Sequence, residues 1–252
     1  MYVLSRFQVL FRQVGPAHCQ RWQHPGMTAA KKRAATLKPS QLRHALNVTA
    51  ATSRHPERDC LAILMTHCAG LRCTELARLE VRDVLWPTGR LREEVQLRAE
   101  TTKNCKARLV FLTNPKLRAA LETYLTYRLR KRLGCSLNDP AYRGLMPYTH
   151  LLLTHRGGGF ELSKKRRILP DGREAEYWAA DALEQRFRQL YRDAGIKTSS
   201  HSGRRSFASA LLKAGVTLEQ TAILLGHADE DVTAAYLHVD RKVLRCMYEF
   251  AL

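Results

Sequence analysis

The sequence predicts a mainly helical α+β domain with a small three-stranded antiparallel sheet. Several segments carry helix start and stop signals around apolar residues at helical spacing, whereas three short segments are β-branched or alternating, as in strands. The 252 residues, 45% of them hydrophobic, are enough to bury a full core. The lack of an apolar run of about 18 residues argues against a membrane span. We therefore expect a soluble, cytoplasmic protein.

Residues 1–35 are predicted to form a basic, irregular tail, and residues 36–252 a single domain. The tail is rich in Arg, Lys, Gln and His and contains the turn signals Gly15-Pro16 and Pro25-Gly26. Met27 offers a second position at which translation can begin, so Met1 need not be the true start.

The first helices are placed by their start signals. Ser40 can cap a helix that runs through residue 47, and Pro56 suits the first turn of a helix that runs through His67. Gly70 ends this second helix. The side chains that it presents to the core are Leu61, Leu64, Met65 and Cys68.

Strands and further helices follow in the middle of the chain. The predicted strands are residues 79–85, 91–97 and 108–112. Residues 115–133 are predicted to form one long basic helix and residues 177–194 another. Between them, residues 134–172 are expected to be mostly loop, with a turn at Gly157-Gly158-Gly159.

Two more helices are predicted before residue 227. Residues 204–214 form the first, which Gly215 closes. Its inward side chains are Phe207, Leu211 and Leu212. The second opens with a capping box at Thr217–Gln220 and ends at Gly226 in a left-handed conformation.

Six separated residues have the side chains that cleavage of a phosphodiester requires: Arg72, Lys103, His201, Arg204, His227 and Tyr236. Two arginines and a lysine can neutralise a pentavalent phosphate, two histidines can donate to it or move protons, and a tyrosine can attack it. Neither a metal nor a cofactor is required. Each residue alone has an ordinary structural interpretation, such as a solvated arginine or a core tyrosine. Their conjunction favours the catalytic one.

In local context and order, these six residues resemble the active-site set of the tyrosine recombinase (phage integrase) family, over residues 37–250. Gly70–Leu76 resembles the family's first arginine motif, with Glu75 at the position of its usual acidic support residue. Residues 102–110 resemble the β-hairpin that holds the family's catalytic lysine. This register selects Lys103, with Lys106 as the competing assignment.

The later motifs are similar to the same family. His201–Arg205 resembles its His-x-x-Arg box, although the family more often has leucine at Gly203 and histidine at Arg205. His227 and Tyr236 have the spacing by which the family brings histidine and nucleophile together. That pair is the most specific signal in the chain.

The resemblance implies a mechanism. Tyr236 attacks a DNA phosphate and leaves a 3′-phosphotyrosyl bond, while Lys103 protonates the departing 5′ oxygen. Arg72 and Arg204 stabilise the phosphorane, His227 donates to a non-bridging oxygen, and His201 assists proton transfer. Two alternatives stay open. One is relaxation of supercoils, as in type IB topoisomerases, and the other is a non-catalytic DNA-binding regulator with a helix-turn-helix over residues 204–225.

The charge of the chain predicts binding to duplex DNA. Its 42 Lys and Arg residues against 23 Asp and Glu give a formal net charge of +19. For each basic run, a solvated charged surface is the alternative. The predicted DNA contacts are Lys31, Lys32, Arg33, Lys106, Arg130, Lys131, Arg132, Lys164, Lys165, Arg166 and Arg205.

The resemblance also implies assembly on DNA. The sequence before residue 36 is too short for the family's N-terminal core-binding domain. We therefore expect that the catalytic domain works alone or that a partner supplies the DNA contacts of that domain. We expect a homo-oligomer that forms a tetramer on DNA. An accessory DNA-bending protein is a further candidate partner. An apolar stripe packs in cis or on a neighbouring protomer, and it consists of Val239, Val243, Leu244, Met247 and Phe250. The target sequence, and the choice among integration, excision and inversion, stay open.

The seven cysteines predict neither disulfides nor a metal site, because their number is odd and no Cys-x-x-Cys pair is present. His18, Cys19 and His24 lack a second cysteine at zinc-finger spacing. Cys73 and Cys105 lie close in sequence to proposed catalytic residues, which predicts that thiol reagents affect activity.

Overall fold

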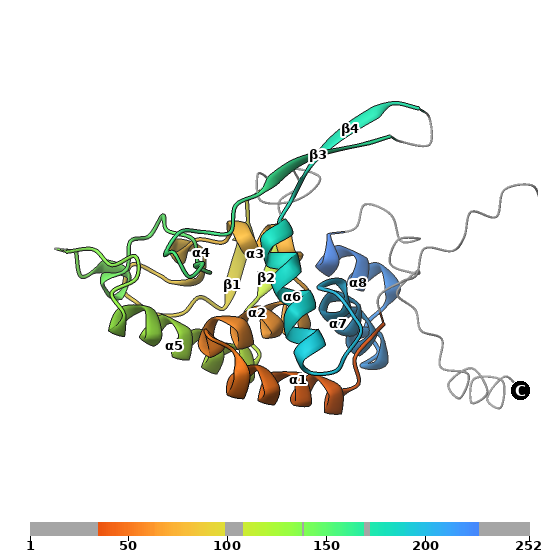
Figure 1. Cartoon of the computed structure of the whole chain (residues 1–252), viewed down its shortest axis with the longest axis horizontal. Coiled ribbons are helices and arrows are strands. Elements are labelled where there is room, and N and C mark those ends of the chain that lie inside the picture. The colour runs from red at the N-terminus through yellow and green to blue at the C-terminus, as the bar shows by residue number, and fades with distance from the viewer. Residues whose placement is uncertain (1–34, 99–107, 138, 169–171, 227–252) are drawn as a thin grey trace, which may run out of the picture. The chain divides into compact units, whose positions relative to one another are not determined.

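A computed structural model describes residues 35–98, 108–137, 139–168 and 172–226, all of which belong to one compact unit (Figure 1). Several predicted features lie outside the described residues. They are the tail up to residue 34 with Lys31, Lys32 and Arg33, the residues Lys103, Cys105, Lys106, His227 and Tyr236, and the stripe from Val239 to Phe250.

Helices pack around a central helix, α2 (Pro56–Cys68), which contacts α1 (Pro39–Thr52), α5 (Pro115–Arg130) and α7 (His201–Lys213). Each of α1, α2 and α5 has a proline at its start, where the missing N–H costs no hydrogen bond. Apolar side chains along α2 are buried, which confirms the predicted inward positions Leu61, Leu64 and Met65, whereas Cys68 is half-buried.

The prediction for α1 was wrong at both ends. Its N-cap is Lys38 rather than Ser40, because the Gln41 side chain accepts a 2.9 Å hydrogen bond from the Lys38 backbone N–H. The helix continues to Thr52 instead of ending at residue 47. Its buried side chains Ala45 and Thr49 are one turn apart, so packing against α2 extends the helix.

The predicted three-stranded sheet is instead a two-stranded one. Strand β1 (Glu94–Leu97) pairs antiparallel with β2 (Arg108–Phe111). Residues 79–85 form the short helix α4 (Val81–Val84), which follows α3 (Cys73–Arg78). The Asp83 carboxylate accepts a 2.8 Å hydrogen bond from the Glu80 backbone N–H and so caps the turn. Leu85 forms an isolated antiparallel β-bridge with Leu91, which is the only part of the predicted pairing between residues 79–85 and 91–97 that these described segments show.

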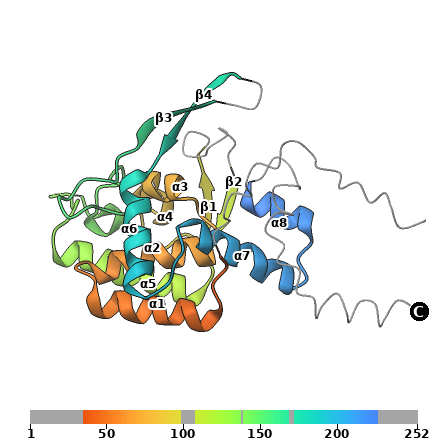
Figure 2. The ribbon, with the colours of Figure 1, turned by 45° about the vertical axis from the view of Figure 1, so that its right-hand side comes forward.

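A second antiparallel pair lies where a loop and the start of a helix were predicted. Strand β3 (Ser163–Ile168) pairs with β4 (Glu174–Ala179), and the ribbon projects from the helices in both views (Figures 1 and 2). Helix α6 (Asp181–Asp193) therefore begins four residues later than residue 177. Strand β3 is almost entirely exposed and lacks the apolar alternation that identifies strands, whereas β4 has one half-buried side formed by Ala175, Tyr177 and Ala179.

Other boundaries also differ modestly from the predicted ones. Helix α5 ends at Arg130 rather than at residue 133. The loop between α5 and β3 contains one 3-10 turn, η2 (Ala141–Gly144). No helix among the described residues is long and apolar enough to cross a membrane.

Helices α7 and α8 (Leu218–Leu225) confirm the last predicted pair, although α7 begins at His201 rather than at residue 204. The predicted capping box is present, since the Thr217 hydroxyl accepts from the Gln220 backbone N–H at 3.1 Å. Gly226 ends α8 with φ +61°. Phe207 and Leu211 are only half-buried, because they line a cavity of about 520 Å³ between α7 and β2.

Candidate active site

The buried carboxylate of Glu75 is the centre of the candidate site. It lies in the first turn of α3 and is fully buried. Arg72, the N-cap of the same helix, approaches it with Nη1 at 2.7 Å and with its backbone N–H at 2.8 Å. Arg108, the first residue of β2, approaches it with Nη2 at 2.6 Å and Nε at 3.3 Å. Two arginines from separate elements are therefore held by one carboxylate.

The C-terminal end of α8 faces the same arginines. Three successive carbonyl groups accept hydrogen bonds, each from a different guanidinium. Leu224 accepts from Arg108 at 2.7 Å, Leu225 from Arg204, and Gly226 from Arg72 at 3.4 Å. These carbonyls have no partner within the helix and carry the negative end of its dipole, so cations stabilise them.

The turn at Gly70 is the third part of the site. Its carbonyl accepts from Arg204 Nη1 at 2.6 Å and from Arg108 Nη2 at 3.4 Å. Gly70 has φ +61°, and a Cβ there would lie 2.5 Å from Phe207 Cδ1. The turn thus requires glycine twice, for its backbone conformation and for its contact with α7. It sets the position of Arg72, two residues later.

The site has an excess of positive charge. Burial raises the pKa of Glu75, but Arg108, Arg204 and Arg72 outweigh it and lower the pKa to about 2, so Glu75 is ionised. Among the described residues of the site, three arginines against one glutamate leave two positive charges that α8 offsets only in part. Such a surplus suits an anion of the phosphodiester class.

The three arginines differ in how far they reach the surface. The Arg108 side chain is 6% exposed and Arg204 is 2% exposed, whereas the Arg72 side chain is 20% exposed. Each terminal nitrogen of Arg72 carries two N–H groups, and its contacts with Glu75 and Gly226 leave further donors on the planar fork. Arg72 can therefore present N–H groups to a bound phosphate while Glu75 fixes its orientation.

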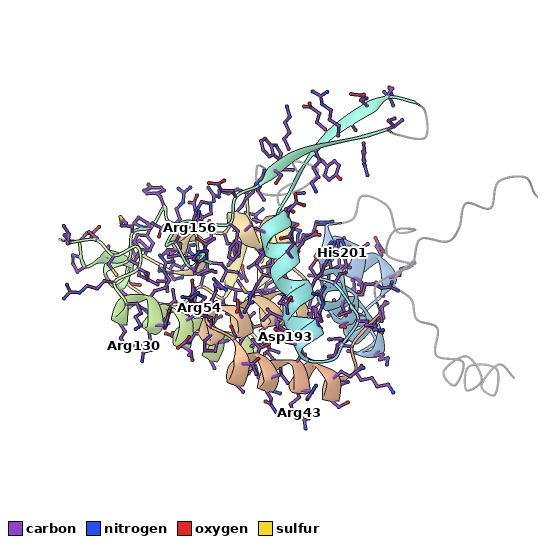
Figure 3. All side chains as sticks on the ribbon, viewed as in Figure 1. Arg43, Arg54, Arg130, Arg156, Asp193 and His201 are labelled. Atoms are coloured by element: carbon purple, nitrogen blue, oxygen red, sulfur yellow. The ribbon has the colours of Figure 1, made fainter. Side chains whose placement is uncertain are left out.

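The structure brings together two of the six predicted catalytic residues, Arg72 and Arg204, and places His201 nearby on α7. His201, labelled in Figure 3, is the first residue of that helix and is exposed. Arg204, one turn later, is buried. Lys103 falls in the connection between β1 and β2, and His227 directly follows Gly226. Their positions, and that of Tyr236, lie outside the described residues.

The predicted DNA contacts fall in different places. Lys164, Lys165 and Arg166 lie on β3 of the exposed ribbon. Arg130 lies at the far end of α5 from His201 in Figure 3, with Lys131 and Arg132 next to it in the chain. Arg205 is half-buried on α7 beside Arg204. The ribbon and the end of α5 are thus separate basic surfaces.

Arg108 is the site residue that the sequence reasoning missed. It was assigned only as the beginning of a strand. In β2, residues 108 and 110 are buried and residues 109 and 111 are exposed. An arginine in phase with Val110 was the available signal, because a buried arginine requires an acidic or carbonyl partner.

Cys73 does not support the prediction that thiol reagents affect activity, and Cys105 lies outside the described residues. The Cys73 side chain is buried, and burial raises the pKa of its thiol to about 12, so the reactive thiolate is absent near neutral pH. No group of His, Cys, Asp or Glu within the described ranges is arranged to hold a metal ion.

Comparisons with known proteins agree with this geometry. The model of the phage integrase family matches residues 35–242. The tyrosine recombinase XerD of Listeria innocua is 27% identical over 194 residues, which cover 76% of this chain and 54% of that protein. XerA of Pyrococcus furiosus is 28% identical over 190 residues, covering 75% and 52%. The chain spans about half the length of the curated relatives that it matches.

Solved structures show the same fold. A crystal structure of XerA recombinase superposes with a TM-score of 0.58 at 22% identity, covering 85% of this chain and 64% of the other. The XerH recombinase bound to its palindromic difH substrate, in a post-cleavage complex, gives a TM-score of 0.60 at 19% identity, covering 87% and 53%.

Proposed function

Because this chain belongs to the phage integrase family, we propose that it is a site-specific DNA recombinase of the tyrosine type. It cleaves and rejoins DNA strands through a 3′-phosphotyrosyl bond to Tyr236. The observation that carries the proposal is the cluster of Arg72, Arg204 and Arg108 around Glu75, because its surplus of positive charge suits a phosphorane. The proposed substrate is duplex DNA, and the proposed location is the cytoplasm.

The described geometry gives the arginines different roles in this reaction. Arg72 touches the phosphate, since its guanidinium is partly exposed and already oriented by Glu75. Arg204 is buried between Gly70 and the end of α8, where it adds positive charge behind the phosphate. His201 assists proton transfer from the exposed start of α7. Lys103 protonates the leaving oxygen, and His227 donates to a non-bridging oxygen.

A covalent-trapping assay tests the proposal. The protein is incubated with a nicked suicide duplex that carries sequence from beside its gene, and the products are separated on a denaturing gel. We expect a protease-sensitive adduct with the wild type and none with Tyr236→Phe. DNA binding without an adduct contradicts the proposal and favours a regulator. Relaxation of any supercoiled plasmid, without pairing of two sites, favours activity of the type IB topoisomerase class.

The β3–β4 ribbon is the DNA contact that we propose first among the basic surfaces. Lys164 and Arg166 pair with Glu176 at 2.6 and 3.3 Å, and Lys165 pairs with Asp181 at 2.7 Å. These exposed ion pairs contribute little to stability, so phosphates can replace the carboxylates. A two-stranded ribbon also has the dimensions to enter the major groove.

Salt dependence separates the ribbon from the other basic surface. For Lys164→Gln/Arg166→Gln, we expect the slope of log affinity against log salt to decrease by about 2, because two phosphate contacts are lost. Arg130→Gln/Lys131→Gln removes the same charge from the end of α5 and serves as the matched control. A larger effect of the control would move the DNA contact to α5.

We also propose assembly into a tetramer on DNA, with the apolar stripe from Val239 to Phe250 docking on a neighbouring protomer. The cavity between α7 and β2 supports this, because partly exposed apolar side chains line it, among them Phe111, Phe207 and Leu211. An accessory DNA-bending protein belongs to the same proposal. Truncation after Asp240 should abolish cooperative recombination. A truncated protein that still recombines cooperatively contradicts the exchange.

A further inference from the structure

Arg108 contacts Glu75, the Gly70 carbonyl and the end of α8 at once. Arg72 binds Glu75 and the end of α8, and Arg204 binds the Gly70 carbonyl and the end of α8. We infer that Arg108 is a positioning residue, which holds Arg72 and the end of α8 in the geometry required for strand cleavage. The inference rests on the proposed function for its chemistry. Its structural basis is the set of contacts that Arg108 makes within the described residues.

The guanidinium of Arg108 joins three elements. Nη2 and Nε bind the Glu75 carboxylate in α3, at 2.6 and 3.3 Å. Nη1 donates to the Leu224 carbonyl in α8 at 2.7 Å, and Nη2 also lies 3.4 Å from the Gly70 carbonyl. Since the side chain itself starts in β2, one residue links β2, α3, the Gly70 turn and α8.

Burial keeps Arg108 from direct contact with DNA. Its side chain is 6% exposed, and its donors are directed at Glu75 and backbone carbonyls. Arg72, by contrast, is 20% exposed and depends on the same Glu75 carboxylate for its orientation. Arg108 therefore acts on the phosphate through Glu75 and Arg72.

The contact with α8 is as close as the one with Glu75. A Cβ added to Gly226 would lie 2.6 Å from Arg108 Cδ, so the end of α8 rests directly on the aliphatic part of Arg108. Residue 227 follows immediately in the chain. Arg108 thus fixes the point from which the segment with the proposed His227 and Tyr236 begins.

Lysine cannot perform this function. The three N–H donors of a lysine radiate from one nitrogen, so they cannot reproduce the planar guanidinium, which directs Nη1 at the Leu224 carbonyl and Nη2 with Nε at Glu75. The conservative substitution Arg108→Lys keeps the charge beside Glu75 but loses the hydrogen bond to the Leu224 carbonyl, while Arg204 and Arg72 keep theirs to Leu225 and Gly226. It therefore separates the geometric role from a purely electrostatic one.

The experiment measures single-turnover formation of the covalent adduct at saturating enzyme, which removes any contribution from DNA affinity. Misplacing reacting groups by about 1 Å costs about 100-fold in rate, and we expect a loss of that size for both Arg108→Gln and Arg108→Lys. The matched control is Arg143→Gln, since Arg143 also binds a carboxylate, Glu122, and a backbone carbonyl, that of Gly89, away from the site. Its rate should stay within about twofold of the wild type. Arg108→Lys at the wild-type rate overturns the inference.

A chemically altered substrate identifies the step that Arg108 supports. A 5′-bridging phosphorothiolate releases a thiolate, which needs no proton from a general acid. If Arg108 acts through Arg72 and α8, as we infer, the rate loss persists with this substrate. If the sulfur restores the wild-type rate, Arg108 serves the lysine-bearing connection between β1 and β2 instead, and the inference is wrong.

A double substitution that removes both buried charges distinguishes loss of positioning from loss of folding. Arg108→Gln alone leaves Glu75 buried with one charge partner fewer, which destabilises the protein. Glu75→Gln/Arg108→Gln removes both charges and keeps hydrogen-bonding side chains. We expect this variant to fold and to cleave about 100-fold slower than the wild type. Cleavage by this double variant at the wild-type rate contradicts the positioning role of Arg108.

Hydrogen exchange tests the inference independently of catalysis. In Arg108→Lys, amides of residues 222–226 should exchange about tenfold faster, while those of α2 stay protected. If the wild type forms no adduct with any duplex, the proposed function fails, and this measurement alone decides the inference. Unchanged exchange at the end of α8 then overturns it.

Discussion

Gly226 and Arg108 lie in direct contact, and a methyl group on Gly226 would come within 2.6 Å of Arg108 Cδ. The glycine also has φ +61°, which is the left-handed conformation that ends α8. One position therefore combines a backbone requirement with a packing requirement. The first was predictable from sequence, and the second depends on a residue 118 positions away, from Arg108 to Gly226.

Gly226→Ala should lower both stability and cleavage. The left-handed backbone costs an alanine about 1 kcal/mol, and the clash with Arg108 adds to this. Gly215→Ala is the control, because Gly215 also follows a helix with φ +87° but has nothing within 4 Å of an added Cβ. Urea unfolding and adduct formation measure the two effects. Equal destabilisation by the two substitutions would contradict the contact.

Glu75 should contribute a pH-dependent part of the stability. Burial opposes its ionisation, but its arginine partners lower its pKa from 4.5 to about 2. Because the folded-state pKa is depressed, this stability is present above pH 4.5 and is lost as the pH falls towards 2. It amounts to on the order of 3 kcal/mol, at about 1.4 kcal/mol for each pKa unit.

Comparison with Glu75→Gln isolates this contribution from that of other carboxylates. Urea unfolding from pH 6 to pH 2 should give two stability curves that lie apart near pH 6 and converge at low pH. Curves that remain parallel through this range would show that Glu75 is not held ionised by the arginines.

His67 should make the protein less stable in mild acid. Its side chain is buried, with Nε2 3.1 Å from the Tyr191 hydroxyl, and burial lowers its pKa from 6.5 to about 4. The neutral imidazole is therefore favoured in the folded state. The resulting stability is present above pH 6.5 and is lost as the pH falls through 4.

Unfolding measured at pH 7 and pH 5 checks this expectation. The wild type should lose on the order of 2 kcal/mol over this interval through His67. His67→Gln removes the titrating group and should show a smaller loss. An identical pH dependence of both proteins would assign the effect to other residues.

Gly203 permits the close packing of α7 against α2. A Cβ there would lie 2.2 Å from Thr66 Oγ1 and 2.6 Å from Thr66 Cβ. Thr66 is fully buried and cannot move aside. Gly203→Ala should therefore lower the free energy of unfolding by about 1–3 kcal/mol, despite the better helix propensity of alanine. Gly203→Leu should be worse, because its side chain is larger.

A smaller side chain at Thr66 tests whether a steric clash causes the loss of stability in Gly203→Ala. Thr66→Ala removes the hydroxyl that an added Cβ would approach most closely, although Cβ remains. In thermal unfolding, Gly203→Ala/Thr66→Ala should regain part of the loss shown by Gly203→Ala. If Gly203→Ala is itself more stable than the wild type, the two helices are not tightly packed at this position.

The sequence by itself predicted the elements whose ends are set by local chemistry. Pro56 and Gly70 mark the limits of α2, and Thr217 and Gly226 those of α8, because a fixed φ, a capping hydroxyl and a left-handed glycine act over a few residues. Arg72 and Arg204 were identified in the same way, from short motifs around each residue.

Tertiary structure decided what depends on distant partners. Residues 79–85 alternate as a strand does, but Val81 donates from its backbone N–H to the Thr149 carbonyl and the segment turns helical. The β3–β4 ribbon has no fully buried side chain, and its strands are paired along their length with ion pairs such as Lys164 with Glu176. Arg108 meets Glu75 33 positions away and Leu224 116 positions away. Such partners carry no local signal, because a buried charge is satisfied by whatever the fold brings beside it.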